Sequence, residues 1–379
     1  FAVLTAKGPL RSRLDTFSRG AGDPNVLLMV WIFILAGAFA GVAKDMGAVN
    51  STVNMALAVI PPKMLFAGMF LTSCFISLSI GTSVGTIAAL APIAAGLATA
   101  CGESKAYMAA VIIGGSFFGD NLSFISDTTI AATRAVGCEM MDKFKANLKI
   151  VLPAVLIVTT LYICHGWGLS VNTQPVIEQW YKLLPYILVI ILALLGGNVA
   201  VILTLGIISA AVIGFLSGAF DWTGFLVSAG KGIASMSDLI IVTLLAGGML
   251  EIIRQGGGLD LIIKVLTKKV RSRTGAQFSI AILVALANIC TANNTIAIIT
   301  TGGIAKDISN RFAISPRKTA SLLDTFSCLV QGLIPYGAQI LMAASLCAVS
   351  PSLIIPVLYY PMIMGVFAIL SIIFDYPRK

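Results

Sequence analysis

The chain has 379 residues, of which 58% are hydrophobic and only 11% are charged, and its mean hydropathy is +0.98. A soluble protein carries roughly 25% charged residues. Stretches of about 20 residues here contain no charge, which is the length of a membrane-spanning helix. The composition excludes an ordinary water-soluble fold and predicts an all-α polytopic membrane protein with the lipid bilayer as its partner.

The 25 Lys and Arg residues and the 16 Asp and Glu residues give a formal net charge of +9. The basic residues lie in short runs between apolar segments, which is typical of cytoplasmic loops rather than of a nucleic-acid-binding surface. We therefore expect no nucleic-acid partner.

The cysteine and histidine content does not indicate a cofactor site. The seven cysteines include no C-x-x-C pair, and the single histidine, His165, stands beside Trp167 at the end of an apolar segment. The sequence has no H-E-x-x-H, and Gly256-Gly257-Gly258 lacks the Lys-Ser/Thr of a P-loop. We expect neither an enzyme nor a bound cofactor.

Uninterrupted apolar segments predict single membrane helices. They are 26–43, 149–165, 183–195, 199–217, 238–253 and 352–374. Because the chain begins with Phe1 rather than Met, we expect an N-terminal piece to be missing, Phe1–Thr5 to be the tail of a lost span, and 1–25 to form a cytoplasmic loop. The Gly-rich segment 220–237 is interpreted as interfacial or re-entrant, and 48–60 is only weakly apolar.

Four longer apolar segments are each interrupted by Gly and small polar residues. The segments are 63–101, 105–135, 275–311 and 317–349, and their interruptions lie at 79–86, 114–129, 290–295 and 331–339. Because these segments exceed one crossing and break in the middle, they predict re-entrant hairpins and discontinuous membrane helices.

Two short sequences recur at nearly the same spacing. Leu35-Ala36-Gly37 recurs as Leu245-Ala246-Gly247, and Thr86-Ile87-Ala88 recurs as Thr295-Ile296-Ala297. Internal repeats with paired interrupted helices are typical of secondary transporters. The predicted organisation is a transmembrane repeat at 26–165, connecting helices and an interfacial segment at 166–237, a second repeat at 238–374 and a cytoplasmic tail at 375–379.

The second repeat is predicted to be inverted. If each repeat begins with a helix and a re-entrant hairpin, an odd number of crossings separates the two repeat starts, which reverses the second repeat. This topology places most Lys and Arg residues inside, as the positive-inside rule requires. It leaves outside only Lys44, Lys63, Lys105, Lys182 and Lys231.

The interruptions carry clusters of polar residues. Non-helical backbone at membrane depth needs partners in the protein or in a water-filled cavity, and its carbonyls suit an alkali cation. Close helix packing explains isolated Gly residues but not these clusters. The expected ion- and proton-binding residues are Ser83, Thr86, Asp120, Asn121, Ser126, Asp127, Thr128, Asn293, Asn294 and Thr295, with Asn288 as a further candidate.

Acidic residues at membrane depth by default mark an ion pathway or a proton relay. Asp324 has no basic residue within a helical turn in the sequence, so it is expected to titrate. Glu251 either takes part in function or pairs with Arg254 at the inner face. We expect a proton and Na⁺, the transported ion, to compete for the oxygens of Asp120, Asp127, Asn294 and Asp324.

The segment Phe118–Thr129 contains Gly119-Asp120 and Ser126-Asp127-Thr128-Thr129, and it resembles the G-D-x-x-S-P-x-S-D-T-T signature of NhaC-type Na⁺/H⁺ antiporters. Phe124 stands where many members carry proline. Leu323-Asp324-Thr325-Phe326, followed by Leu333-Ile334-Pro335-Tyr336, resembles the second signature of that family. The resemblance covers about 26–374.

Asn293-Asn294-Thr295 is similar to the hairpin-tip motif of the wider ion transporter superfamily, whereas Val84-Gly85-Thr86 lacks the Asn. That resemblance implies an elevator-like motion and a homodimer.

Together these features imply a secondary active transporter, multi-pass in a bacterial inner (plasma) membrane, that exchanges cytoplasmic Na⁺ for external H⁺ by alternating access. An alternative stays open: a Na⁺- or H⁺-coupled carrier or exchanger of a small organic acid or amino acid. A channel is disfavoured because the polar residues gather at four interruptions rather than along whole helix faces.

Overall fold

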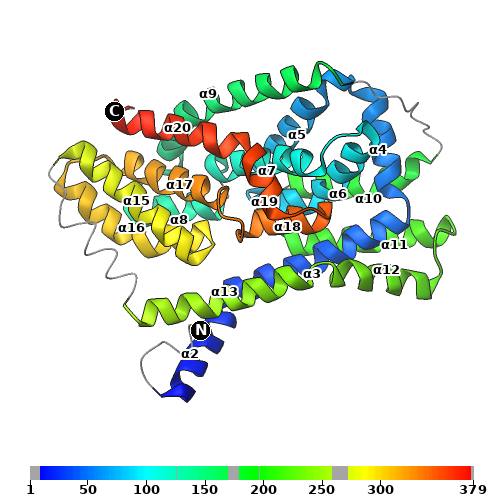
Figure 1. The fold of residues 1–379 in the computed structure, drawn as a ribbon, viewed down its shortest axis with the longest axis horizontal. Helices are drawn as coiled ribbons and strands as arrows, with labels where there is room; N and C mark the ends of the chain where they lie inside the picture. Colours follow the sequence, from blue (N-terminus) through cyan, green and yellow to red (C-terminus); the bar gives the residue numbers. More distant parts are fainter. Residues whose placement is uncertain (1–8, 125, 170–178, 196, 258–271, 377–379) are drawn as a thin grey trace.

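A computed structural model describes residues 9–124, 126–169, 179–195, 197–257 and 272–376. Within these ranges the chain is helical and contains no strand (Figure 1). Some of the predictions lie outside the described residues. They concern Phe1–Thr5, part of the connecting segment (170–178), the basic loop of the second half (258–271) and part of the tail (377–379).

The first half of the chain runs from an N-terminal helix to a long helix that follows the second interruption. Its elements are α2 (Leu10–Ala21), α3 (Pro24–Asp45), α4 (Ala48–Val59), η1 (Pro62–Met64), α5 (Leu65–Ile80), α6 (Ser83–Cys101), α7 (Lys105–Leu122), α8 (Asp127–Val136) and α9 (Met140–Gly166). The predicted loop at 1–25 therefore contains the helix α2.

A connecting region precedes a second set of helices. Its elements are η2 (Trp180–Leu183), α10 (Leu184–Leu194), α11 (Val199–Leu216) and α12 (Trp222–Ala234). The second set comprises α13 (Ser237–Gln255), α15 (Arg273–Thr291), α16 (Asn294–Arg311), α17 (Pro316–Gln331), α18 (Ala338–Cys347), α19 (Pro351–Ile354), η3 (Ile355–Val357) and α20 (Tyr359–Ile373).

Seven helical stretches in the described residues are long and apolar enough to cross a membrane, or up to eight if one bent pair counts as a span. The seven are Val26–Asp45, Pro62–Ser79, Ser83–Cys101, Lys105–Val136, Met140–Gly166, Val199–Leu216 and Arg273–Thr291. The bent pair, Ala338–Cys347 and Pro351–Val357, turns by 102°. The prediction of an all-α polytopic membrane protein is confirmed.

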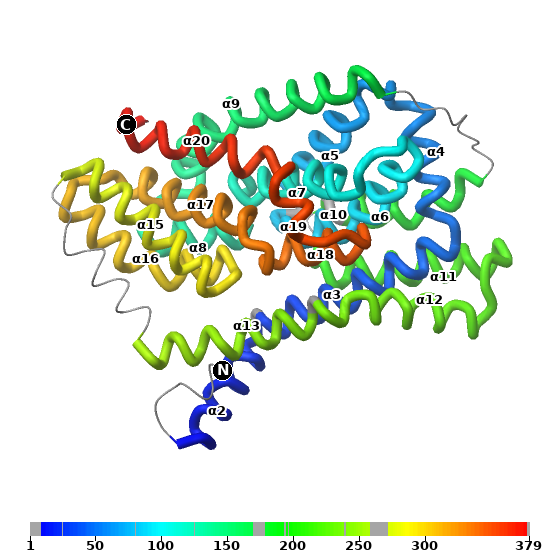
Figure 2. Tube along the Cα trace, viewed as in Figure 1, coloured from blue at the N-terminus to red at the C-terminus, as the bar shows by residue number. Residues whose placement is uncertain are grey.

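Apart from α4 and η1 in the first set and α19 and η3 in the second, the described elements follow the same order: a helix, a helical hairpin, a helix in two parts and a closing helix. In the first set these are α3, α5–α6, α7–α8 and α9, and in the second α13, α15–α16, α17–α18 and α20. The tube in Figure 2 lets the eye follow both sets. The opposite orientation of the two sets remains a prediction.

One predicted interruption, 114–129, is much shorter than expected. Helix α7 continues through Gly114 to Leu122, and only residues 123–126 separate it from α8. The glycines serve close packing of α7 on α5, because a Cβ at Gly115 or Gly119 would clash with Ser73 or Ser77. The Ser73 hydroxyl reaches across to the Ile112 carbonyl at 2.6 Å.

Two further boundaries differ from the sequence prediction. Helix α9 begins at Met140, nine residues before the predicted start at 149. The predicted span 352–374 is not one helix, because α19 and η3 precede α20 and a break falls at Leu358. Pro356 lacks a backbone N–H and so cannot continue the α-helical ladder there.

Helices α12 and α13 follow one another along α3 at one edge of the molecule (Figure 1). Gly37 and Gly41 of α3 face Gly232 and Ser228 of α12 at distances that leave no room for a Cβ. Segment 220–237, interpreted as interfacial or re-entrant, is therefore a helix packed lengthwise on α3.

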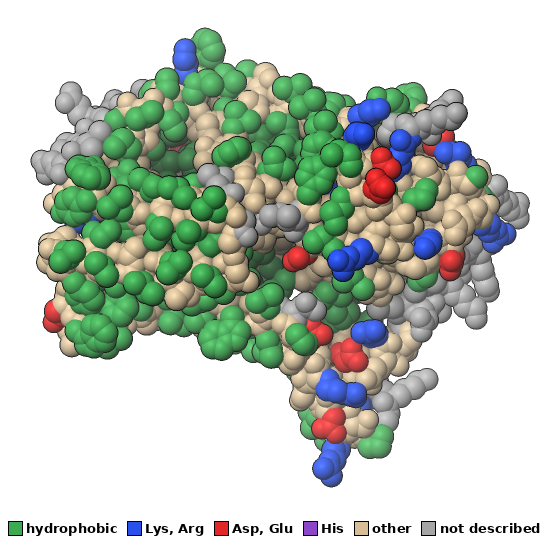
Figure 3. Space-filling model, turned by 180° about the vertical axis from the view of Figure 1, so that it is seen from behind, with side chains coloured by type: hydrophobic (Ala, Val, Ile, Leu, Met, Phe, Trp, Pro, Cys, Tyr) green, Lys and Arg blue, Asp and Glu red, His purple; other side chains and the backbone are tan. Residues whose placement is uncertain are grey.

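The exterior is largely apolar. Figure 3 shows hydrophobic side chains over most of one face, with charged side chains gathered toward one end and on the protruding helix α2. Exposed large apolar residues include Leu195, Val201, Leu216 and Trp222 of the connecting region. Such a surface is stable against lipid tails and not against water.

Candidate functional site

A polar cavity of about 130 Å³ lies where the helix interruptions meet. Its wall comes from the α5–α6 tip, the α7–α8 break, the α15–α16 tip, the start of α18 and one face of α3. The cavity brings together most of the predicted site residues, namely Ser83, Asp120, Ser126, Asp127, Thr128, Asn293, Asn294 and Thr295. It is large enough for a cation with several waters.

Asp120 is the buried carboxylate of the cavity and is 4% exposed. The Ser83 hydroxyl donates to Oδ2 at 2.7 Å, the Ser83 N–H donates to Oδ1 at 3.2 Å, and the Asn294 amide donates to Oδ2 at 3.4 Å. All three donors are neutral. When it is ionised, the carboxylate has no cationic partner among the described residues, so a cation in the adjacent open space would neutralise it.

Three further predicted residues complete one wall. Asp127 opens α8 with its side chain exposed toward the cavity. Ser126 and Thr128 exchange a hydroxyl–hydroxyl hydrogen bond of 2.8 Å, and Thr128 also donates to the Asp120 carbonyl at 2.9 Å. The second bond ties the first turn of α8 to Asp120 near the end of α7.

At the starts of two helices that line the cavity, α6 and α16, backbone N–H groups already donate hydrogen bonds to side chains. The Asn293 side-chain oxygen accepts from Ile296 N–H, and the Asn294 side-chain oxygen accepts from Thr295 N–H, both at 3.0 Å. At the start of α6, the Ser83 N–H donates to Asp120. A helix N-terminus attracts anions through such N–H groups, and here side chains of the protein itself occupy them.

Ser83 stands in Gly81-Thr82-Ser83-Val84-Gly85, which has the spacing of the nucleophile motif of serine hydrolases. In that motif the serine follows a strand and faces a histidine. Here it begins helix α6, its hydroxyl faces Asp120, and His165 lies at the far end of α9 stacked on Tyr107. Ser83 therefore lacks the strand and the histidine partner that the nucleophile motif requires.

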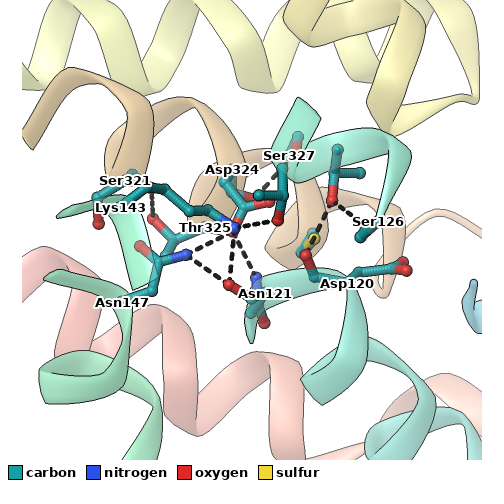
Figure 4. A network of polar contacts seen from close by, with 12 residues as sticks. Asp120, Asn121, Ser126, Lys143, Asn147, Ser321, Asp324, Thr325 and Ser327 are labelled. Atoms are coloured by element: carbon teal, nitrogen blue, oxygen red, sulfur yellow. Dashed lines mark hydrogen bonds and ion pairs between the residues drawn. The ribbon is translucent and has the colours of Figure 1, made fainter. Parts of the chain in front are cut away.

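Asp324 lies outside the cavity wall, in a second buried network (Figure 4). Lys143 of α9 approaches Asp324 Oδ2 to 3.0 Å, and its ammonium also donates to the Asn121 carbonyl and the Thr129 hydroxyl, each at 2.7 Å. Asn147 donates to the same carboxylate oxygen at 2.6 Å. The network ties α7, α8, α9 and α17 together.

Asp324 has no basic residue within a helical turn along α17, but a basic partner, Lys143, reaches it from α9. Lys143 precedes the predicted helix start at 149, but α9 begins early enough to bury Lys143 to 1% exposure. A signal was present: Lys143 and Asn147 are four residues apart, so they share one helix face.

The two networks meet at adjacent residues of α7. Asp120 faces the cavity, whereas the Asn121 side chain donates to Asp324 at 3.2 Å and accepts from the Tyr360 hydroxyl at 2.9 Å. Asp324 Oδ1 is buried without a hydrogen-bond partner among the described residues. Sequence reasoning found Asn121 and Asp324 but missed Lys143, Asn147 and Tyr360.

Besides Asn121 and Asp324, three predicted residues do not line the cavity. The Thr86 hydroxyl donates to the Thr82 carbonyl within its own hairpin. Asn288 donates to the Ser327 carbonyl at 2.7 Å and joins α15 to α17. Glu251, whose side chain is 25% exposed beside Gly20 of α2, forms an ion pair with Arg254 at 3.9 Å. Of the two interpretations of Glu251, the geometry fits the surface pair.

The Na⁺/H⁺ antiporter family model matches residues 2–167 and 176–375. The chain belongs to this family. The antiporter is similar to the Na⁺/H⁺ antiporter NhaC of Alkalihalophilus pseudofirmus, at 24% identity over 82% of this chain and 74% of that protein. It is 25% identical to NhaC of Bacillus subtilis, over 92% of this chain and 84% of the relative.

The antiporter is also 25% identical to the malate-2H⁺/Na⁺-lactate antiporter of Bacillus subtilis, over 94% of this chain and 83% of that protein. Among solved structures, the YdaH transporter of Alcanivorax borkumensis aligns with a TM-score of 0.46 at 16% identity, covering 97% of this chain and 88% of that one.

Family membership confirms the resemblance to NhaC-type antiporters. The protein is therefore a multi-pass membrane transporter rather than an enzyme, and the ions that it moves are Na⁺ and H⁺.

Proposed function

We propose that the antiporter exchanges cytoplasmic Na⁺ for external H⁺ and binds Na⁺ in the polar cavity, next to Asp120. The observation that carries the proposal is the buried Asp120 carboxylate, which receives hydrogen bonds from neutral groups only and faces a cavity of about 130 Å³. Ser83, Thr128 and Asn294 supply further oxygens on the cavity wall, and Asp127 adds a second carboxylate.

Exchange follows from competition at Asp120. A proton and Na⁺ both neutralise the carboxylate, and its oxygens hold only one of them at a time. If the loaded site faces each side of the membrane in turn, binding of one ion requires release of the other. No chemical step beyond protonation is needed.

Alternating access by inverted repeats is part of the proposal. The site combines Ser83 and Asp120 of the first set of helices with Asn294 of the second. A site built at the boundary between two sets opens to either side when one set moves against the other. A homodimer and a bacterial plasma membrane complete the proposed setting.

In this proposal Asp324 belongs to the transport centre but is not the acid that exchanges ions. Lys143 already neutralises it, so the pair adds no net charge to the buried network. Asp324 acts on the site through Asn121, whose neighbour in the chain is Asp120. This assignment replaces the expectation that Asp324 itself titrates.

A small organic acid is a second candidate because of the malate and lactate named for one relative. The cavity charge argues against it. Asp120 and Asp127 are both acidic, and none of the residues that line the cavity in the described part of the chain is basic. A carboxylate substrate would meet two like charges without a counter-ion, which is costly in a buried site.

Purified protein in liposomes tests the proposal. When the liposome interior is made acidic, Na⁺ added outside should collapse the pH gradient without any organic solute. Asp120→Asn should abolish the effect. Gradient collapse that requires malate, lactate or an amino acid would support the carrier instead. Normal Na⁺ dependence in Asp120→Asn would move the site away from the cavity.

A further inference from the structure

Gln339, at the start of α18, lies on the cavity wall and is 4% exposed. Its side-chain nitrogen donates to the Ser83 hydroxyl at 2.9 Å, and that hydroxyl donates to Asp120. Its side-chain oxygen accepts from the Gln331 nitrogen, also at 2.9 Å. Gln331 in turn donates to the Ala292 carbonyl at 2.9 Å.

These bonds form one chain that joins three helix interruptions and ends on α7, close to the fourth. It starts at Ala292 in the α15–α16 tip, passes across the α17–α18 break through the two glutamines, and reaches Ser83 at the α5–α6 tip. It ends on Asp120, ahead of the α7–α8 break. Every step from Gln331 onward donates toward the carboxylate, so the chain has a direction.

This direction of donation leaves one amide oxygen without a donor among the described residues. With both amides in this orientation, the Gln331 side-chain oxygen is buried without a hydrogen-bond partner among the described residues. The cavity side of Gln339 presents an N–H group, which cannot bind a cation. An amide has a nitrogen and an oxygen of nearly equal shape, so a half turn exchanges donor and acceptor without changing its volume.

A half turn of Gln339 would place its oxygen beside Ser83 and Asp120. Without a bound cation that turn is unfavourable, because Gln331 would then face another donor and Ser83 would lose the N–H that it accepts. A cation in the cavity reverses the balance, since the amide oxygen becomes one of its ligands. Cation binding and amide orientation are therefore linked.

We propose that Gln339 is a ligand of the transported cation, and that Gln331 holds its amide in the non-binding orientation when the cavity is empty. The inference rests on the proposed Na⁺ site at Asp120. It adds a residue of the second set of helices to that site. The Gln331 N–H group and the cation then compete for the same Gln339 oxygen.

Three substitutions separate a ligand from a structural side chain, with Na⁺-dependent gradient collapse in liposomes as the first readout. Q339M keeps the length but has no amide, and should raise the KM for Na⁺ about tenfold with little change in maximal rate. Q339E presents oxygens only, and should keep the KM at or below the wild-type value. Q331M removes the restraining donor and should lower it.

The second readout is the rise in Tm of the detergent-solubilised protein on Na⁺ addition, which does not depend on turnover. That rise should shrink in Q339M and persist in Q339E. S345A is the matched control on α18, because Ser345 bonds to Ser235 away from the cavity, and it should behave as wild type in both assays.

A merely structural glutamine predicts a different pattern: Q339M, Q339E and Q331M would all weaken Na⁺ binding together. That pattern, or an unchanged KM in Q339M, overturns the inference. The proposed function still stands in that case if the wild type exchanges Na⁺ for H⁺ and Asp120→Asn does not. If Q339M does not fold, Q331M still decides. The proposal predicts that Q331M lowers the KM for Na⁺, whereas a structural role predicts that it weakens Na⁺ binding. Absence of Na⁺-driven proton movement in the wild type would instead refute the proposed function.

Discussion

The ammonium group of Lys143 lies 3.0 Å from Asp324 Oδ2, and both side chains are at most 1% exposed. The pair joins the first turn of α9 to the middle of α17, two helices that are far apart in the sequence. Asp324 Oδ2 forms the ion pair with this ammonium group and accepts hydrogen bonds from the side-chain amides of Asn121 and Asn147.

Loss of Lys143 should destabilise the protein more than loss of the whole pair. Lys143→Met leaves a buried carboxylate without its counter-ion, which typically costs about 3–5 kcal/mol. The double variant Lys143→Met with Asp324→Asn removes both charges and should recover much of that loss. Thermal unfolding of the wild type, Lys143→Met, Asp324→Asn and the double variant in detergent measures the coupling. Strict additivity would show that the two groups do not stabilise one another.

Asp120→Asn and Asp127→Asn should affect Na⁺ differently, although both carboxylates line the cavity. Asp120 is buried and bonded to Ser83, so its loss should abolish Na⁺-dependent proton movement. Asp127 is exposed, so water screens it, and its loss should raise the KM for Na⁺ only several-fold. Initial rates of gradient collapse over a Na⁺ series provide the comparison. Equal losses in both variants would contradict the distinction.

Gly119→Ala should push α7 away from α5. A Cβ at Gly119 would clash with the backbone and side chain of Ser77, neither of which can yield without moving its helix. Overpacking of this kind costs about 1–3 kcal/mol. Gly303→Ala on α16 is the matched control, because a Cβ there meets nothing within 4 Å. Unfolding temperatures in detergent should fall for the first variant and not for the second.

Asp221 should stabilise the start of α12 in a pH-dependent way. The Gly224 N–H and the Thr223 hydroxyl hold the pKa of this carboxylate below its ordinary value, because both donate to the ionised form. The stabilisation is therefore present above the unfolded-state pKa of about 3.9 and is lost as pH falls through the lower folded-state pKa.

Asp221→Ala should accordingly lower the unfolding temperature at neutral pH, with the difference from wild type shrinking in strong acid. Asp221→Asn retains a side-chain oxygen for the cap and serves as the control, since its contribution should not vary with pH. A difference that stays constant down to strongly acid pH would indicate that the carboxylate charge plays no part.

The sequence identified the interruptions because their signal is local. Small polar residues inside an apolar segment mark a break whatever surrounds them, and the tips at Gly81 and Ala292 fall inside the predicted ranges. Both tip residues have positive φ, 74° and 51° respectively. The side chains at these breaks were also found, since polar groups at membrane depth must meet one another or water.

Contacts between distant segments could not be found in this way. The helical part of 114–129 looks like a break because glycine signals both unwinding and close packing, and only the position of Ser77 decides between them. The Lys143 ion pair depends on where α9 starts relative to α17. Gln331 and Gln339 were overlooked because each is an ordinary polar residue until the break between them brings it to Ser83.

The packing of α7 on α5 constrains how the transporter can change shape. The two helices are joined by serine-to-carbonyl bonds at Ser73 and Ser77, and their glycine-lined contact leaves no slack for sliding. We therefore expect Asp120 on α7 to move together with α5 during transport. A covalent cross-link between these two helices should leave turnover intact, whereas one that fastens the hairpin to α3 should arrest it.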